Sequence, residues 1–268
     1  MNHNEILMLG TGNALVTRCY NTCFVLRSRN GNMVMVDAGG GNGILTQLER
    51  AAIDRSQIRH LFVTHAHTDH ILGVVWMMRL ALQYPSPQPL HIYSHRKVLD
   101  TLQAIARLIL PAKLTACMGC DVILHEVRDG ETICINDIAL RCFDIHSTKE
   151  QQFGFEAILP GTRRLACLGD EPFCKENEPY VTGADWLMSE AFCLYADRDR
   201  FHPYEKHHST ALDAARLANR LRVKGLILYH TEDQTLSTRR QAYTAEARTA
   251  FSGRICVPDD LETIDLEA

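Results

Sequence analysis

Residues 64–73 read THAHTDHILG, a stretch that carries three histidines and one aspartate within six positions (65–70). Imidazole nitrogens and carboxylate oxygens are ligands that zinc prefers. His65 and His67 are two apart, so an extended chain projects both to one side, whereas Asp69 and His70 lie in the turn that enters the next helix. The spacing indicates two neighbouring metal sites. The alternative, a solvated histidine-rich loop, fits poorly with the strand and helix signals on either side.

The flanks of this motif predict a strand before it and a helix after it. Leu61 to Val63 form a short apolar run that ends at Thr64. From Asp69 to Gln83 the apolar residues recur at helical spacing, and the proline-rich segment 85–89 stops the helix. The junction of a buried strand with a helix is where α/β folds place their chemistry.

Further strands and helices are predicted on both sides of the motif. Upstream, we expect strands over Ile6 to Leu9, Cys23 to Leu26 and Met33 to Val36, and then a helix around Leu45 to Ala52. Downstream, we expect strands at Leu90 to Tyr93, Val122 to Val127, Thr132 to Ile135, Ala139 to Ile145, Phe153 to Leu159, Leu165 to Leu168 and Leu226 to Tyr229, with helices at His95 to Leu110, Ala211 to Leu221 and Thr238 to Phe251. This order predicts a layered α/β fold. Because no low-complexity linker interrupts it, we expect one domain over 1–268.

Composition excludes some classes of protein. The chain has 268 residues, of which 46% are hydrophobic and 22% charged, as in ordinary globular proteins. A net charge of −4 does not favour a strongly nucleic-acid-binding surface, and we interpret the pairs Arg163-Arg164 and Arg239-Arg240 as solvated charge. Neither a secretory signal nor an apolar run of membrane-spanning length is apparent, so we expect a cytoplasmic protein with no membrane partner.

The ten cysteines are best interpreted as reduced thiols. Cys134, Cys142, Cys167 and Cys193 lie among apolar neighbours, which predicts that they are buried. The spaced pair formed by Cys117 and Cys120 lacks a second Cys or His pair at zinc-finger distance, so we leave it outside the site.

Three more candidate ligands directly follow predicted strands. His146 follows Ala139 to Ile145, Asp170 follows Leu165 to Leu168, and His230 follows Leu226 to Tyr229. Singly, such residues are more often caps or turn residues. Together with the motif at 65–70, their shared position after strands predicts that they are metal ligands.

The motif resembles a known signature. THAHTDH followed by Ile71-Leu72-Gly73 is similar to the HxHxDH signature of the metallo-β-lactamase superfamily, and VDAGGG at 36–41 resembles the Asp-x-Gly stretch ahead of it. Within the superfamily the chain resembles the ribonuclease Z branch and its small phosphodiesterase relatives. That resemblance rests on LGTG (9–12), GDE (169–171) where the branch has Gly-Asp-Thr, SEAF (189–192) where it has His-Glu-Ala-Thr, and HST (208–210).

The resemblance implies a four-layer αββα sandwich with two zinc ions, manganese being an alternative, and a homodimer. It assigns His65, His67 and His146 to one ion, Asp69, His70 and His230 to the other, and Asp170 to both. Two such ions would lower the pKa of a bridging water and hold a phosphodiester oxygen. The resemblance also makes His208 the proton donor to the leaving group, and Glu190 fixes the tautomer of His208. Asp69 is predicted to be catalytic as well as a metal ligand. A histidine paired with a carboxylate can be cationic near pH 7.

Departures from the branch bear on the substrate. The interval 147–169 has 23 residues, too few for the long arm with which many ribonuclease Z enzymes grip tRNA. Tyr20 replaces the Arg of the usual Arg-Asn, and Glu171 and Phe192 replace the two threonines. We therefore predict hydrolysis of a small or single-stranded phosphodiester, such as a cyclic nucleotide or a cyclic phosphate. A true tRNA 3′-processing nuclease that binds RNA, a thioester or lactone hydrolase and an aryl sulfatase stay open as alternatives, whereas a non-enzymatic scaffold would be expected to have lost ligands.

Overall fold

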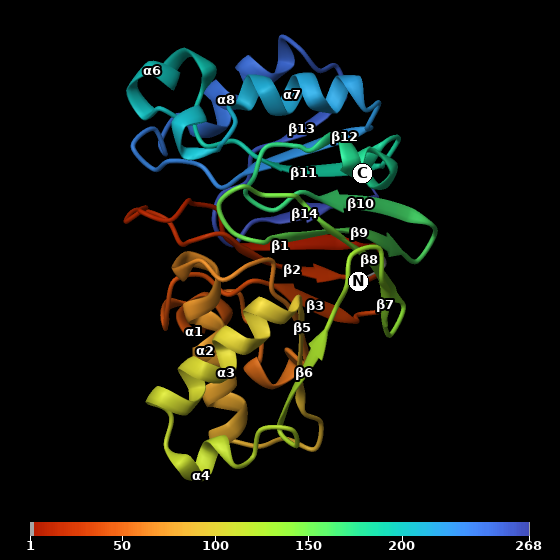
Figure 1. Ribbon diagram of the computed structural model, residues 1–268. Helices are drawn as coiled ribbons and strands as arrows, with labels where there is room; N and C mark the ends of the chain where they lie inside the picture. The colour runs from red at the N-terminus through yellow and green to blue at the C-terminus, as the bar shows by residue number, and fades with distance from the viewer. Residues whose placement is uncertain (1–2, 268) are drawn as a thin grey trace.

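Two seven-stranded sheets lie face to face in the computed structural model, and helices cover both outer sides (Figure 1). The structure describes residues 3–267, so residues 1, 2 and 268 of the predicted domain lie outside the described part. This αββα arrangement confirms the predicted fold class. Among residues 3–267, no helix combines the length and the hydropathy needed to cross a membrane.

The first sheet has its helices below it in Figure 1. Its strands, in spatial order, are β14 (Thr263–Asp265), β1 (Glu5–Gly10), β2 (Cys23–Arg27), β3 (Met33–Val36), β4 (His60–Phe62), β5 (Leu90–Ser94) and β6 (Val122–Glu126). The pairs from β14 to β3 are antiparallel and those from β3 to β6 are parallel. The accompanying helices are α1 (Gly43–Arg50), α2 (Thr68–Gln83), α3 (Arg96–Ile109) and α4 (Ala112–Thr115).

The second sheet repeats this mixed plan. Its strands, in spatial order, are β13 (Arg254–Cys256), β12 (Gly225–Tyr229), β11 (Trp186–Glu190), β10 (Arg163–Cys167), β9 (Phe153–Leu159), β8 (Ile138–Asp144) and β7 (Thr132–Ile135). The pairs from β7 to β10 are antiparallel and those from β10 to β13 are parallel. Its helices are α5 (Glu178–Val181), α6 (Arg198–Phe201), α7 (Ala211–Arg220) and α8 (Arg239–Arg248), and short 3-10 turns lie at Arg55–Gln57, Lys175–Asn177, Tyr195–Asp197 and Tyr204–Lys206.

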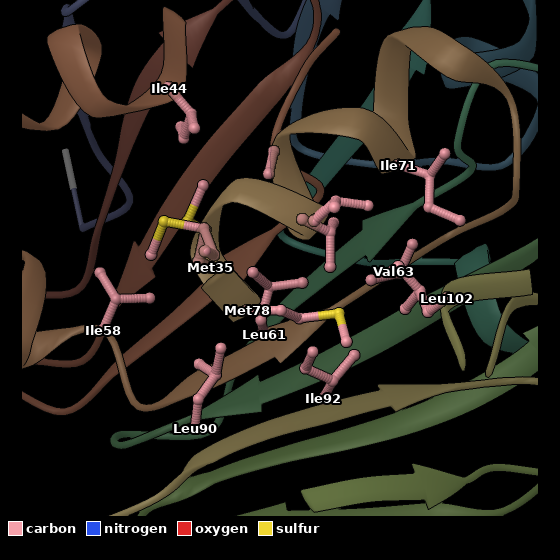
Figure 2. Close-up of a cluster of buried hydrophobic side chains, with 14 of the residues drawn as sticks. Met35, Ile44, Ile58, Leu61, Val63, Ile71, Met78, Leu90, Ile92 and Leu102 are labelled. Carbon is pink, nitrogen blue, oxygen red and sulfur yellow. The ribbon is translucent and has the colours of Figure 1, made fainter. Parts of the chain in front are cut away.

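Apolar cores fill the spaces between these layers. Side chains alternate across a strand, so Leu61 packs toward the helices while Phe62 packs between the sheets. Figure 2 shows the helix-side core, where Leu61 and Ile92 from the first sheet meet Met78 of α2 and Leu102 of α3. Because both faces of the central strands are buried, their sequences are apolar throughout rather than alternating.

Gly73 brings the start of α2 against the loop after β3. A Cβ atom at Gly73 would lie 1.8 Å from the carbonyl oxygen of Ala38. The Gly73 N–H donates to the Gly39 carbonyl at 2.8 Å, and the Ala38 N–H donates to the His70 carbonyl at 3.1 Å. This close approach holds the metal-ligand motif beside the segment that carries Asp37.

The predicted strands and helices correspond to elements of the structure, with ends that differ by a few residues. β11, β13 and β14 have no predicted counterpart. β13 and β14 are three residues each, too short for a periodic pattern. β11 ends in Ser189 and Glu190, polar residues whose burial depends on the tertiary structure.

Two predictions, one of a buried and one of an exposed side chain, were wrong. Cys134 is exposed because it lies on the edge strand β7, where it points away from the face that Ile135 buries; all ten cysteines are free. Arg239 is buried rather than solvated. Its guanidinium donates to the hydroxyls of Thr11 and Thr231 at 3.0 Å each and pairs with Asp259 at 2.8 Å. It thereby ties the loop after β1 to the loop after β12.

Candidate metal centre and pocket

Six of the seven predicted ligands come from four places in the fold. His65 and His67 lie in the loop between β4 and α2, and Asp69 and His70 occupy the first turn of α2. Asp170 follows β10 and His230 follows β12, so the two sheets supply residues to a common site. Parallel strands end together at one edge of each sheet, and this brings the ligands together.

Five of these residues form two adjoining groups. His65, His70 and Asp170 make one group, and Asp69, His70 and His230 make the other; in each, the ligand atoms lie within 4.8 Å of one another. Asp170 Oδ2 is 3.6 Å from His65 Nε2, 3.8 Å from His70 Nε2 and 3.6 Å from His230 Nε2. His70 Nε2 is 3.3 Å from Asp69 Oδ2. His70 belongs to both groups, and Asp170 lies beside the histidines of both.

His67 reaches the same place from the loop. Its Nδ1 is 2.9 Å from His65 Nε2, and its half-buried ring lines the neighbouring pocket. His67 therefore lies next to His65, although it belongs to neither of the two ligand groups.

The residues fit divalent cations. His70 Nε2 and Asp170 Oδ1 are buried and have no hydrogen-bond partner among residues 3–267. Burial acts to lower the pKa of His70, but the carboxylates of Asp69 and Asp37 outweigh it and raise that pKa well above its usual value. The surrounding carboxylates thus favour positive charge at the centre. Nitrogen and oxygen donors in this mixture suit zinc.

Hydrogen-bonding groups at the Nδ1 atoms orient the rings of His70 and His65. His70 Nδ1 donates to Asp37 Oδ2 at 2.8 Å, which directs Nε2 at the centre. The Asp37 carboxylate also accepts from the Thr64 N–H at 2.8 Å and hydroxyl at 2.7 Å, and that hydroxyl lies 2.9 Å from His65 Nδ1. Asp37 has a φ of 54°, a left-handed conformation that aspartate adopts more readily than most residues other than glycine. One carboxylate therefore supports two ligands.

His230 is oriented in the same manner. Its Nδ1 lies 3.0 Å from the hydroxyl of Thr22, leaving Nε2 to face Asp170. His230 also has a left-handed backbone, with a φ of 58°, at the end of β12. Such strained positions are found where the surrounding structure enforces them, often at functional sites.

His146 is placed apart from the other predicted ligands. It is exposed and lies outside both ligand groups. The chain turns through a φ of 60° at this residue, and its N–H donates to Asp144 Oδ1 at 2.7 Å. This turn leaves the imidazole in solvent, so the structure does not bring His146 together with His65 and His67.

Glu190 and His208 lie beside the centre. Glu190, fully buried at the end of β11, accepts hydrogen bonds from the Ser209 hydroxyl at 2.6 Å, from the Ser209 N–H and from the Phe192 N–H at 3.2 Å. His208 Nδ1 is 3.7 Å from Glu190 Oε2 and has no hydrogen-bond partner among the described residues. Its ring stacks on Phe192 with 4.9 Å between ring centroids.

Burial governs the protonation of this pair. It raises the pKa of Glu190 to about 8 and lowers the pKa of His208 to about 3. In the metal-free protein burial therefore favours the neutral form of each group, so that Glu190 binds a proton more tightly than His208 does. Removal of the ring from water opposes a cationic His208 in the metal-free protein, and the proton-donor role of His208 stays a prediction.

A pocket of about 430 Å³ opens over the centre. One wall carries His67, Asp69, Asp170, His208 and His230. The remainder combines apolar and charged side chains, which include Leu15, Val16, Phe192, Phe201, Lys149, Lys206, Glu232 and Asp233. Sequence reasoning singled out neither lysine, since both lie in loops where single charges are ordinary. Thr22 and Thr64 were not predicted as supporting residues, because their roles depend on contacts with residues distant in the sequence.

A family model described as anti-Pycsar protein Apyc1 matches residues 4–249. The ribonuclease Z of Methanothermobacter thermautotrophicus is 25% identical over 312 aligned positions, which cover 98% of this chain and 97% of that protein. The metallo-β-lactamase fold protein YhfI from Bacillus subtilis is similar in structure, with a TM-score of 0.78, 16% identity and coverage of 99% and 100% of the two chains. Human tRNase Z, short form, has a TM-score of 0.75, 22% identity and coverage of 98% and 99%. At these identities the two structures bear on the fold alone.

Proposed function

The chain belongs to the family described as anti-Pycsar protein Apyc1, whose model matches residues 4–249, and from its ligand groups and pocket we propose that it is a two-metal hydrolase of small phosphodiesters. The resemblance to ribonuclease Z-like members of the metallo-β-lactamase superfamily is confirmed, and the protein is a metal-dependent hydrolase. One observation carries the finer proposal. The two adjoining ligand groups, which share His70, open on the same pocket as His208.

Six of the seven predicted ligands would hold the ions. His65 and His67 would bind one ion, Asp69, His70 and His230 the other, and Asp170 both; this assignment follows the shared position of Asp170 between the histidines. We propose zinc, with manganese as the alternative, because the donors are nitrogen and oxygen. When bound, two such ions supply an activated water and neutralise the charge of a phosphate.

His208 would protonate the leaving oxygen. In the metal-free protein burial favours a neutral ring, and Glu190 binds a proton more tightly than His208 does. An anionic phosphodiester in the pocket would favour a cationic His208, so the proton would move to the ring once the 3.7 Å gap to Glu190 closes. Ser209 would hold Glu190 in place through its hydroxyl and its N–H. Glu190 is therefore a positioning residue that also stores the proton.

The surface supports a small substrate rather than a folded RNA. Most of the interval 147–169 forms β9 (Phe153–Leu159) and β10 (Arg163–Cys167), and residues 160–162 join the two strands. This supports the prediction that the interval carries no long arm. The chain carries 28 basic against 32 acidic residues, whereas tight binding of folded RNA relies on many contacts of lysine and arginine with phosphates. A pocket of about 430 Å³ is within the size range of small-molecule sites.

The test compares substrates at fixed salt. We expect kcat/KM for bis(p-nitrophenyl) phosphate and for a cyclic nucleotide to exceed that for a precursor tRNA with a 3′ trailer. Efficient trailer removal together with poor turnover of the small diesters would overturn the proposal and make the protein a tRNA-processing nuclease. If the protein hydrolyses thioesters or aryl sulfates but no phosphodiester, it is a thioesterase or a sulfatase instead.

We also propose that the protein works in the cytoplasm as a homodimer. Ten free cysteines are typical of a reducing compartment. Leu108 and Ile109 at the end of α3 are 84% and 61% exposed, and a second copy could cover them. Light scattering on the purified protein decides between monomer and dimer.

A further inference from the structure

Glu171 departs from the ribonuclease Z-like motif, which has threonine at this position, and its carboxylate is buried beside the pocket. The residue directly follows Asp170 and is 5% exposed. Its Oε1 accepts hydrogen bonds from Ser147 Oγ at 2.8 Å and from Gln152 Nε2 at 3.3 Å, and pairs with Lys149 Nζ at 2.9 Å. A threonine could not reach all three groups. Glu171 therefore fastens the loop 147–152, which connects β8 to β9, against the residue after a predicted metal ligand.

Lys149 is the member of this loop that lines the pocket. Its side chain is 22% exposed, and its Nζ also lies 3.4 Å from the Lys206 carbonyl oxygen. Thr148 Oγ1 lies 3.2 Å from His207 Nδ1, so the loop contacts the segment that presents His208. An ammonium group has three donors, and these contacts leave capacity for a bound anion.

The two lysines of the pocket differ in their contacts. Lys206, the other lysine of the pocket, is held by its own segment and by a ring rather than by a carboxylate: its Nζ donates to the Phe201 carbonyl at 2.8 Å and lies 4.9 Å from the centre of the Phe192 ring.

We propose that Lys149, positioned by Glu171, binds a phosphate oxygen of the substrate and selects anionic phosphodiesters over neutral acyl esters. This inference rests on the proposed function and names what distinguishes its substrates. A phosphodiester carries its negative charge on two non-bridging oxygens, and both an ammonium group and a cationic metal centre can engage them. A neutral ester or thioester offers no anion, so a cation at this position gives it no comparable contact.

The experiment uses four variants of the full chain. Lys149→Gln removes the charge, Lys149→Arg keeps it, and Glu171→Gln removes the carboxylate that holds Lys149. Lys97→Gln is the matched control, because Lys97 pairs with Glu150 of the same loop at 2.9 Å, is 57% exposed and does not line the pocket. We measure kcat and KM for bis(p-nitrophenyl) phosphate and for p-nitrophenyl acetate. Calorimetry gives the dissociation constant of inorganic phosphate on the protein as purified and after zinc loading.

Lys149→Gln should lower kcat/KM for the diester about 10- to 100-fold, mainly through KM, and weaken phosphate binding by a similar factor, as loss of a charge-assisted contact does. Hydrolysis of the acetate, where it occurs, should change less than about twofold. Lys149→Arg should restore most of the loss, and Glu171→Gln should show a smaller loss of the same pattern. A general defect in folding would instead lower kcat for both substrates.

Phosphate binding decides the inference even without turnover. If Lys149→Gln binds phosphate as tightly as the wild type, or if Lys97→Gln loses as much as Lys149→Gln, Lys149 is not the phosphate-binding group. A wild type that binds no phosphate also overturns the inference. A wild type that binds phosphate but cleaves no diester contradicts the proposed function and leaves the role of Lys149 supported.

Discussion

Replacing His208 by asparagine removes the only group of the site that is proposed to donate a proton to the leaving oxygen. Its Nδ1 lies 3.7 Å from Glu190, and no other residue among those described is assigned this role. Loss of a positioned general acid slows a reaction by about 10² to 10⁴, which corresponds to roughly 2.7 to 5.4 kcal/mol in the activation free energy. We expect that loss in kcat for an alkyl diester such as a cyclic nucleotide.

The leaving group separates this role from a structural one. A nitrophenolate departs without a proton, so the loss for bis(p-nitrophenyl) phosphate should be much smaller than for the alkyl diester. His208 is not a predicted ligand, so zinc content measured by elemental analysis should stay at the wild-type value. His207→Asn is the matched control. His207 adopts a φ of 56°, a left-handed conformation that asparagine tolerates, and its ring does not line the pocket.

Equal losses for the nitrophenyl and alkyl diesters would refute the proton-donor assignment. A large loss of kcat in His207→Asn with little change in His208→Asn would assign the proton-donor role to His207 instead of His208. A fall in zinc content of His208→Asn would place that ring at an ion instead.

Three further results are expected. Elemental analysis should find about two zinc ions per chain, and His146→Ala should keep both because its ring lies outside the ligand groups; loss of one ion in that variant would mean that His146 turns inward on metal binding. Asp170→Ala should lose both activity and metal, since its carboxylate lies beside three histidines, and full activity would show that it is no ligand. Burial raises the pKa of Glu190 to about 8 from an unfolded value near 4.5, so folding favours its protonated form and the metal-free protein should lose stability as pH rises between these values. Relative to Glu190→Gln, whose amide does not titrate, the wild-type free energy of unfolding should fall by at most about 1.4 kcal/mol per pH unit over that range, and parallel pH curves for the two proteins would contradict the assignment.

Local patterns predicted a large part of the fold. Apolar runs bounded by turn residues, and helical spacing after the motif, identified elements that the structure contains, because strand and helix periodicity follow from backbone geometry. The short strands β13 and β14 were not predicted, because three residues are too few to show the alternation of a strand. Cys134 and Arg239 were misjudged because exposure at an edge strand, or burial under two loops, depends on neighbours distant in the sequence.

The sequence by itself determined the ligand chemistry and the fold class. Four ligand-type side chains in six positions after a strand indicate a metal site, and that prediction follows from spacing alone. Only the tertiary structure decided which distant residues complete the site. Asp37 reaches His70 across 33 positions, Thr22 reaches His230 across 208, and Glu171 pairs with Lys149 because the loop after β8 folds back over the end of β10. The same packing left His146 in solvent, since the exposure of a side chain depends on how its loop packs and not on its neighbours in the sequence.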